Sequence, residues 1–524
     1  MNRVSIREGN TGILRVRRED GLEERYVPNY DLAAARELLL AWQDLRDGTG
    51  RRLKDNYRVE GINWFPTVVN YAHGRVFANY VKYQPLVDRV LDGELEPNFE
   101  NEGEFARLLS LLQGRVDRRS MKAAAFNALV SLNNRLVARR SHAHILFFRF
   151  TPDDFRTVAA KQALDDLGAT YVEALGAQTH LLLASLRRGG DRYFYGRTVA
   201  KNVFGKRYEH EGLAAPVSVL FALTTEWLET KMSTFIAEYR AHTRDLRTAR
   251  FKTFYGIDDT QTILPLLYAC QDQKIDTVAH QHGAAYHRWH ASYMMEGLRP
   301  EEIRWFDKLI VWDEYWRERF SALSNLRPHG GVVVGGDLFG DQFRATETES
   351  PVGTHRPRAI LVPYEFLTNT YQVGLYVTKL LRLGYDVWFK PRSDEKLEDQ
   401  LDAYCLPPDS LDRLKIVRRL TREFIDGIDV VAGTMSTLVY QLIPFRKAVW
   451  LLETDYPCYL DHLADEGYIH RIRYEDLDKL EERHFAPSTR DLQPLSCARA
   501  LKDTLARHVL GAANEHGLGE EPAA

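Results

Sequence analysis

Residues 251–283 read FKTFYGIDDTQTILPLLYACQDQKIDTVAHQHG, which is the hydrophobic pattern of a strand, a helix and a second strand. The strand candidate Phe251–Gly256 is rich in aromatic residues and is closed by glycine. Apolar residues then recur at helical spacing over Thr260–Gln273, and the short apolar run Thr277–Ala279 follows. A βαβ unit of this kind joins parallel strands and places its chemistry beyond their carboxyl ends.

Two histidines lie where the second of these strands ends, at His280 and His282. Residues two apart in an extended chain point to the same face. An imidazole, whose ordinary pKa is about 6.5, can take up a proton at neutral pH. His282 is therefore our first candidate for a general base, and His280, Asp258 and Asp259 are alternatives. The other interpretation is that both histidines only make structural hydrogen bonds.

The bulk properties of the chain narrow the classes of protein to which it can belong. Its 524 residues predict two or three domains, and a net charge of −3 gives no general attraction to nucleic acid. The N-terminus lacks an apolar leader, and no apolar run approaches the roughly 18 residues of a membrane span. The four cysteines have no C-x-x-C spacing, which argues against a zinc site and favours a reducing compartment. We therefore expect a soluble, cytoplasmic protein.

Strand and helix patterns alternate along most of the chain from about residue 143 onward. A glycine-containing hinge is predicted at Arg327–Gly331, and Val332–Val334 is expected to open a second α/β series. We expect an α/β fold of four parts: a mixed, mostly helical extension at 1–125, a first Rossmann-like domain at 126–328, a second at 329–480, and a C-terminal helix with a disordered tail at 481–524.

Several short motifs follow one another at strand ends in this pattern. They are the strand that leads into His282-Gly283, DKLIVW at 307–312, VGGD at 334–337, FKP at 389–391 and GTMSTLVY at 433–440. Their order over residues 250–455 is similar to that of bacterial surface-polysaccharide glycosyltransferases of the GT-B fold, the enzymes of capsule, lipopolysaccharide and teichoic-acid synthesis. The resemblance implies two Rossmann-like domains that face each other across a cleft. It also implies sugar transfer from a nucleotide-sugar donor to a growing surface polysaccharide, a glycan or a lipid-linked glycan.

The donor is expected at the strand ends of the second series. The candidate donor-binding residues share this position, and they are Lys390, Arg392, Thr434, Ser436, Thr437 and Glu453. The cations would pair with a diphosphate, and the hydroxyl residues open a helix whose unpaired amides favour a phosphate. Glu453 is expected to hold a ribose hydroxyl. The alternatives are a surface ion pair for the cations and simple helix capping for the hydroxyls.

The motif around Lys390 departs from the pattern of the family. Many relatives have Lys-Pro-His-Pro where this chain has Lys390-Pro391-Arg392-Ser393, and the missing histidine argues against a CMP-sugar or CDP-polyol donor. The Asp-x-Asp spacing at Asp476–Asp478 lies at the start of a solvated helix, so we predict no catalytic metal and no cofactor.

Two other functions remain open. The first is a nucleotide-sugar epimerase of the same double fold, which would need several carboxylates in the cleft. The second is a non-catalytic partner in polysaccharide assembly. In addition, the basic helix at Arg115–Arg140 is interpreted either as a peripheral contact with the anionic inner face of the membrane or as a solvated helix.

Overall fold

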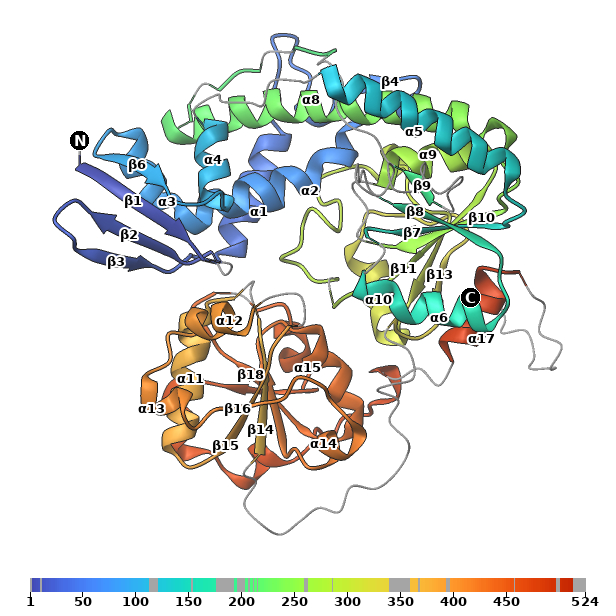
Figure 1. Cartoon of the computed structure of the whole chain (residues 1–524). Helices are drawn as coiled ribbons and strands as arrows, with labels where there is room; N and C mark the ends of the chain where they lie inside the picture. Colours follow the sequence, from blue (N-terminus) through green and yellow to red (C-terminus); the bar gives the residue numbers. More distant parts are fainter. Residues whose placement is uncertain are drawn as a thin grey trace.

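The computed structural model describes residues 2–9, 12–112, 121–151, 154–175, 193–195, 203–205, 208–210, 212–213, 215–258, 263–284, 286–338, 359–365, 368–392, 396–456, 458–495 and 500–511. These residues form three bodies (Figure 1). We call them the N-terminal module (described residues of 2–112), the first domain (121–338) and the second domain (359–495).

The first domain is built on a sheet of seven strands in the described part of the chain. All neighbours are parallel, in the order β13-β12-β11-β10-β7-β8-β9. The strands are β7 Ile145–Arg149, β8 Tyr171–Leu175, β9 Tyr193–Tyr195, β10 Thr253–Ile257, β11 Asp276–His280, β12 Lys308–Val311 and β13 Val332–Val334. The helices are α5 Met121–Arg140, α6 Val158–Asp166, α8 Ala215–Asp245, α9 Leu264–Asp272 and α10 Glu314–Leu323. The predicted βαβ unit is confirmed, because α9 connects the parallel strands β10 and β11.

The second domain holds a parallel sheet of six strands within the described residues, in the order β16-β15-β14-β17-β18-β19. The strands are β14 Ala359–Pro363, β15 Asp386–Lys390, β16 Lys415–Ile416, β17 Val430–Gly433, β18 Ala448–Leu452 and β19 His470–Ile472. The helices are α11 Thr370–Arg382, α12 Leu397–Ala403, α13 Pro408–Leu411, α14 Arg422–Asp426, α15 Thr437–Leu442 and α16 Asp461–Asp465. Figure 1 shows helices on both sides of this sheet, which explains why β18 is apolar and buried at every position. The predicted fold class, two α/β domains with parallel sheets, is confirmed.

The border between the domains differs from the prediction. Strand β13 does not open the second series, because it pairs with β12 at the edge of the first sheet, with Leu309 opposite Val332. The segment expected to be a hinge is a turn, in which the amide of Gly331 donates to the carbonyl of Pro328. This turn brings β13 back beside β12. A run of three valines suits any parallel edge, so its hydrophobic pattern could not indicate which sheet it joins.

The C-terminal helix α17, Leu501–His508, packs on the first domain although it follows the second in sequence. Leu501 and Leu505 are buried in one core cluster with Ile145 of β7. The hydroxyl of Thr504 donates to the carbonyl of Gly335, 2.6 Å away, just after β13. The chain therefore crosses from the first domain to the second and returns. The tail predicted to be disordered lies outside the described residues from 512 onward.

The N-terminal module combines a mixed four-stranded sheet with helices. The sheet has the order β3-β2-β1-β6, formed by β1 Asn2–Glu8, β2 Leu14–Arg18, β3 Glu23–Tyr26 and β6 Leu95–Phe99. A short hairpin, β4 Arg58–Val59 and β5 Ile62–Asn63, accompanies it. The helices are α1 Leu32–Gln43, α2 Val69–Tyr71, a π-helical segment Ala72–Phe77, α3 Ala78–Leu91 and α4 Glu104–Leu112. The predicted cap of α1 is confirmed, because the Asp31 carboxylate accepts from the amide of Ala34 at 2.9 Å.

Helix α8 of the first domain contacts the N-terminal module through buried hydrogen bonds. The indole of Trp42 donates to the Thr225 hydroxyl at 3.0 Å, and the Tyr57 hydroxyl donates to Glu229 at 2.9 Å. All four side chains are buried, so the module and the first domain share a continuous core. No helix in the described part of the chain combines the length and the apolar character needed to cross a membrane.

Candidate active site

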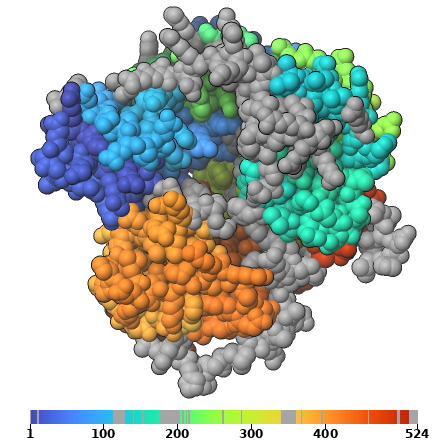
Figure 2. Space-filling view, in the orientation of Figure 1, coloured from blue at the N-terminus to red at the C-terminus, as the bar shows by residue number. Residues whose placement is uncertain are grey.

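A cleft of about 810 Å³ lies where the three bodies meet. Its walls are the residues after β11 in the first domain, the residues after β14, β15, β16 and β17 in the second domain, and segments of α1, α3 and the π-helical segment in the module. In the surface view of Figure 2 the module (blue) lies above the second domain (orange), with part of the first domain (teal) beside them. The cleft is therefore lined by the carboxyl ends of two parallel sheets, where α/β proteins place their ligands.

His282 lines this cleft and is paired with Asp258. Its Nδ1 lies 2.5 Å from the Asp258 Oδ1, and its backbone amide donates to the same oxygen at 3.0 Å. The Tyr286 hydroxyl donates to the other carboxylate oxygen at 2.6 Å. Asp258 follows β10 and His282 follows β11, so the pairing of these neighbouring strands brings the two side chains together. The result is an imidazole whose orientation is fixed by a buried carboxylate, which is the arrangement that a general base requires.

The ionisation of Asp258 supports this arrangement. Burial by itself would raise the pKa of Asp258, but the charge of His282 and the hydrogen bonds from His282 and Tyr286 hold the pKa below its usual value. The carboxylate is 1% exposed, so it acts on the histidine and does not reach a ligand. Asp258 is thus brought to the site, but as the partner of the base. Asp259 lies outside the described residues.

His280 is not brought to the cleft. It is fully buried, with Nδ1 3.0 Å from the Tyr255 hydroxyl and Nε2 2.8 Å from the carbonyl of Gly336. Since a carbonyl can only accept, Nε2 carries the proton and Nδ1 accepts from the phenol. Burial lowers the pKa of His280 to about 4, so the ring stays neutral and ties three segments of the first domain together. The expectation that His280 and His282 share a face is corrected, because His280 ends strand β11 and is buried, whereas His282 lies beyond the strand and lines the cleft.

The second domain contributes a cationic wall. Lys390 and Arg392 line the cleft after β15, as the sequence predicted, and burial lowers the pKa of Lys390. The backbone of Arg392 is held on both sides by Gln400, which accepts from its amide at 2.8 Å and donates to its carbonyl at 3.0 Å. Arg418 and Arg419, which were not predicted from the sequence, line the same wall after β16. The signal that could have revealed them is a pair of arginines directly after a predicted strand.

The backbone amides of the turn that leads into α15 are occupied by Glu365. Its carboxylate, which follows β14, accepts from the backbone amides of Thr434 at 2.7 Å, Met435 at 3.0 Å and Ser436 at 2.7 Å. Thr434 is buried, and its hydroxyl also donates to Glu365. An acidic side chain of the protein therefore already satisfies the amides that precede the helix, and phosphate binding at the start of α15 itself stays a prediction from the sequence. This pairing was hidden in the sequence because Glu365 and Thr434 are 69 positions apart.

The two hydroxyl residues after Thr434 do reach the cleft. Ser436 caps α15 by accepting from the amide of Leu438 at 3.2 Å. The Thr437 hydroxyl oxygen accepts from the amide of Ala284 at 3.4 Å, two residues after His282. The start of α15 in the second domain therefore adjoins the loop that carries the candidate base in the first.

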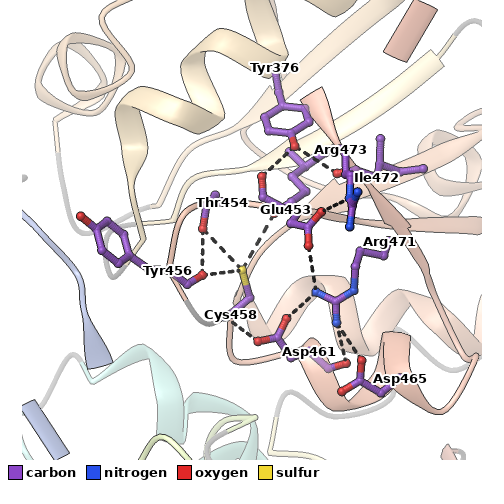
Figure 3. A network of polar contacts seen from close by, with 11 residues as sticks. Tyr376, Glu453, Thr454, Tyr456, Cys458, Asp461, Asp465, Arg471, Ile472 and Arg473 are labelled. Carbon is purple, nitrogen blue, oxygen red and sulfur yellow. Dashed lines mark hydrogen bonds and ion pairs between the residues drawn. The ribbon is translucent and has the colours of Figure 1, made fainter. Parts of the chain in front are cut away.

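Glu453 lies away from the cleft, in an ion-pair network (Figure 3). The guanidinium of Arg473 donates to its carboxylate at 2.8 Å, and that of Arg471 lies 3.9 Å from it. The structure thus pairs Glu453, which follows β18, with arginines at the end of β19, and does not place it in the lining of the cleft that contains Lys390.

The described residues contain no group of three or more histidine, cysteine, aspartate or glutamate side chains arranged to hold a metal ion. Metal-independent chemistry remains a prediction from the sequence. The described cleft thus brings an oriented imidazole and a cationic wall together.

No protein-family model matches this chain, and no curated protein matches it. Among solved structures, MurG of Acinetobacter baumannii has 11% identity, with 66% of this chain and 88% of that chain covered, at a TM-score of 0.36. A UDP-GlcNAc 2-epimerase from Neisseria meningitidis bound to UDP-GlcNAc has 11% identity, with 70% and 98% covered, at a TM-score of 0.41. CalG4, the calicheamicin glycosyltransferase, has 11% identity, with 70% and 93% covered, at a TM-score of 0.39. Likeness at this level carries no argument about activity, and the fold class rests on the two parallel sheets described above.

Proposed function

We propose that this protein is a metal-independent glycosyltransferase that moves a sugar from a nucleotide-sugar donor to a growing surface polysaccharide or glycolipid acceptor. The observation that carries the proposal is that one cleft holds both the His282–Asp258 pair and a wall of four cationic side chains. Glycosyl transfer needs a base for the acceptor hydroxyl and positive charge for the departing phosphate. The surface-polysaccharide acceptor is supported by the order of the sequence motifs.

The pair of His282 with Asp258 defines the proposed role of the base. Because the ionised carboxylate only accepts, Nδ1 carries a proton, and Nε2 is the nitrogen that acts as the base when the ring is neutral. In the reaction, Nε2 takes the proton of the acceptor hydroxyl as its oxygen forms a bond to the anomeric carbon. Asp258 then stabilises the imidazolium that results.

The second domain would receive the leaving group. As the bond between the anomeric carbon and the phosphate oxygen breaks, the electron pair stays on the nucleoside diphosphate. Lys390 and Arg392 would neutralise this charge together with Arg418 and Arg419, and a guanidinium can bind phosphate oxygens bidentately. Ser436 and Thr437 supply hydroxyl groups on the same wall.

The carboxylates of the cleft favour a transferase over an epimerase. Asp31 caps α1, Glu104 binds Lys82 with 3.2 Å between charged atoms, and Glu365 binds the amides after β17. Each of these carboxylates therefore has a structural partner. An epimerase would need cleft carboxylates that can abstract a proton from the sugar, and the described lining includes no other acidic residue.

The proposal is tested by incubating the protein with UDP-, CDP-, GDP- and TDP-linked sugars and measuring nucleotide release, first with water as the acceptor and then with glycan extracts. We expect release from one nucleotide class, with loss of release in His282→Asn. Isomerisation of the sugar without nucleotide release would establish an epimerase instead. Nucleotide binding without any turnover would establish the non-catalytic partner.

A further inference from the structure

The cleft has a third wall, and the proposed donor chemistry does not use it. This wall belongs to the N-terminal module and includes Tyr30, Asn70, His73 and the pair of Lys82 with Glu104. Because Glu104 neutralises Lys82 at 3.2 Å, the wall lacks the excess positive charge of the second domain. It is a polar but nearly neutral surface, opposite a strongly cationic one.

A series of ring contacts connects the candidate base to this wall. The ring centroid of His282 lies 6.4 Å from that of Tyr293, and Tyr293 stacks on His290 at 4.9 Å. His290 in turn stacks on Tyr459 at 6.0 Å and lies 6.3 Å from His73 of the module. All five rings line the cleft. Aromatic and imidazole faces of this kind are suited to the apolar face of a sugar ring, and a ligand seated on them would lie beside His282.

His73 adds a hydrogen-bond acceptor that the protein itself leaves unused. The Ser292 hydroxyl oxygen lies 3.1 Å from both the Asn70 side-chain oxygen and the His73 Nδ1. The amide oxygen can only accept, so the one serine proton goes to Asn70 and Nδ1 of His73 must be the donor. Nε2 then carries a lone pair that no described residue uses, on a ring that stays neutral because burial and the nearby His290 lower the pKa of His73 to about 3.

This Nε2 atom is buried and has no hydrogen-bond partner among the described residues. A buried acceptor without a partner is unfavourable, and each such atom in a native protein requires a physical explanation. The atom also belongs to a π-helical segment, Ala72–Phe77, in the wall of the cleft. Short π-helical insertions occur frequently at functional sites. The position of His73 is therefore explained best by a ligand that donates a hydrogen bond.

We propose that the N-terminal module and the rings of His290, Tyr293 and Tyr459 form a subsite for a neutral pyranose of the acceptor glycan. The sugar stacks on the rings and donates one hydroxyl hydrogen to Nε2 of His73, while the hydroxyl to be glycosylated lies at His282. The assignment to the acceptor rests on the proposed transferase function. The donor lies on the other side of His282, where Thr437 contacts Ala284.

Two variants of His73 separate the two nitrogen atoms of its ring. His73→Asn places an amide near the former Nδ1, so it retains the contact with Ser292 but lacks the acceptor. His73→Gln places a carbonyl oxygen near the former Nε2. A third variant, Tyr459→Leu, removes one ring and retains apolar volume, and it tests the same subsite if either histidine variant does not fold. Thermal unfolding of each variant verifies the fold.

The probes are the methyl pyranosides of glucose, galactose, mannose and N-acetylglucosamine, measured by saturation-transfer NMR and titration at millimolar concentration. We expect at least one to bind the wild type, about tenfold more weakly to His73→Asn and Tyr459→Leu, and within about threefold of wild type to His73→Gln. Absence of binding by all four glycosides, or equal binding to the wild type and His73→Asn, would overturn the subsite. Nucleotide release by the wild type is measured separately, so loss of the transferase proposal and loss of the subsite are distinguishable.

Discussion

The two α/β domains have the same architecture and present opposite chemistry at the same place. In the first domain, the carboxyl ends of β10 and β11 bring together a buried carboxylate and an oriented imidazole. In the second, cationic side chains follow β15 and β16. The carboxylate of Glu365, which follows β14, accepts hydrogen bonds from backbone amides of the same domain. The comparison teaches that a parallel sheet determines where a site lies, while a few residues after each strand determine what the site does.

The largest expected effect is in the first domain. His282→Asn should lower the rate of transfer by about 10²–10⁴-fold, because it removes the base but retains a polar side chain of similar size. Nucleotide affinity should stay the same, since the second domain holds the donor. The measurement is steady-state transfer together with calorimetric titration of the nucleotide. His280→Gln is the matched control from two residues away, and a rate loss there equal to that of His282→Asn would remove the distinction between the two histidines.

The contact between the two domains should depend on pH. The Tyr440 hydroxyl of the second domain donates to Asp313 of the first at 2.6 Å. Burial, reinforced by Asp337, raises the pKa of Asp313 to about 7 despite this hydrogen bond. The folded protein then holds a proton that the unfolded chain loses above about pH 4, so the free energy of unfolding should fall as the pH rises from about 4 to about 7.

Asp313→Asn should remove this dependence, because the amide cannot ionise. Its free energy of unfolding relative to wild type should rise by on the order of 4 kcal/mol between pH 4 and pH 8. Urea unfolding at several pH values measures this difference. A variant whose stability follows wild type in parallel over that range would show that Asp313 does not titrate there.

The cationic wall of the second domain should affect binding alone. Arg392→Ala should weaken nucleoside diphosphate binding by roughly 1.5–3 kcal/mol, the range for hydrogen bonds to charged groups. Arg418→Ala and Arg419→Ala should cost less, because both side chains are more exposed to solvent. Calorimetric titration measures each change, and His282→Asn serves as the control with intact affinity. Unaltered affinity in Arg392→Ala would exclude this residue from the donor site.

The smallest effect concerns the membrane. Helix α5 retains Arg135 and Arg139 of the predicted basic helix, while Arg115, Arg118 and Arg119 lie outside the described residues. Arg135 is already paired with Asp245 at 3.2 Å. We expect weak binding to anionic vesicles, about 1 kcal/mol for each basic residue near the surface, which is lost at high salt. Flotation at two salt concentrations measures it, with neutral vesicles as the control. If the protein does not float with anionic vesicles at low salt, only the interpretation as a solvated helix is left.

The fold could be predicted from the sequence where the pattern is local. The βαβ unit around α9 and the strands β14, β15, β17 and β18 of the second domain follow from apolar runs that are separated by helical periods, whereas β19 has no such run. The placement of β13 could not be predicted, because its three valines do not indicate which strand lies beside them in the sheet. Strand pairing over a distance depends on the whole sheet.

The candidate site was predictable only in part, for the same reason. His282, Lys390 and Arg392 follow strands, and this position led to the cleft, although Glu453 also follows a strand and lies away from it. The role of Glu365 and the wall formed by His73 depend on contacts between segments far apart in the chain. Glu365 also follows a strand, but no local pattern indicates which amides it binds, and no local pattern marks His73.

The carboxylate of Glu365 also has a consequence for ligand binding. It holds the turn at residues 434–436 in its final shape through three backbone amides. Binding of a ligand beside Ser436 and Thr437 then requires little loss of conformational entropy at this turn, so more of the interaction energy is retained as affinity. The turn beside the proposed donor site is therefore ordered in the absence of ligand. Hydrogen exchange at these three amides should be slow before any nucleotide is added.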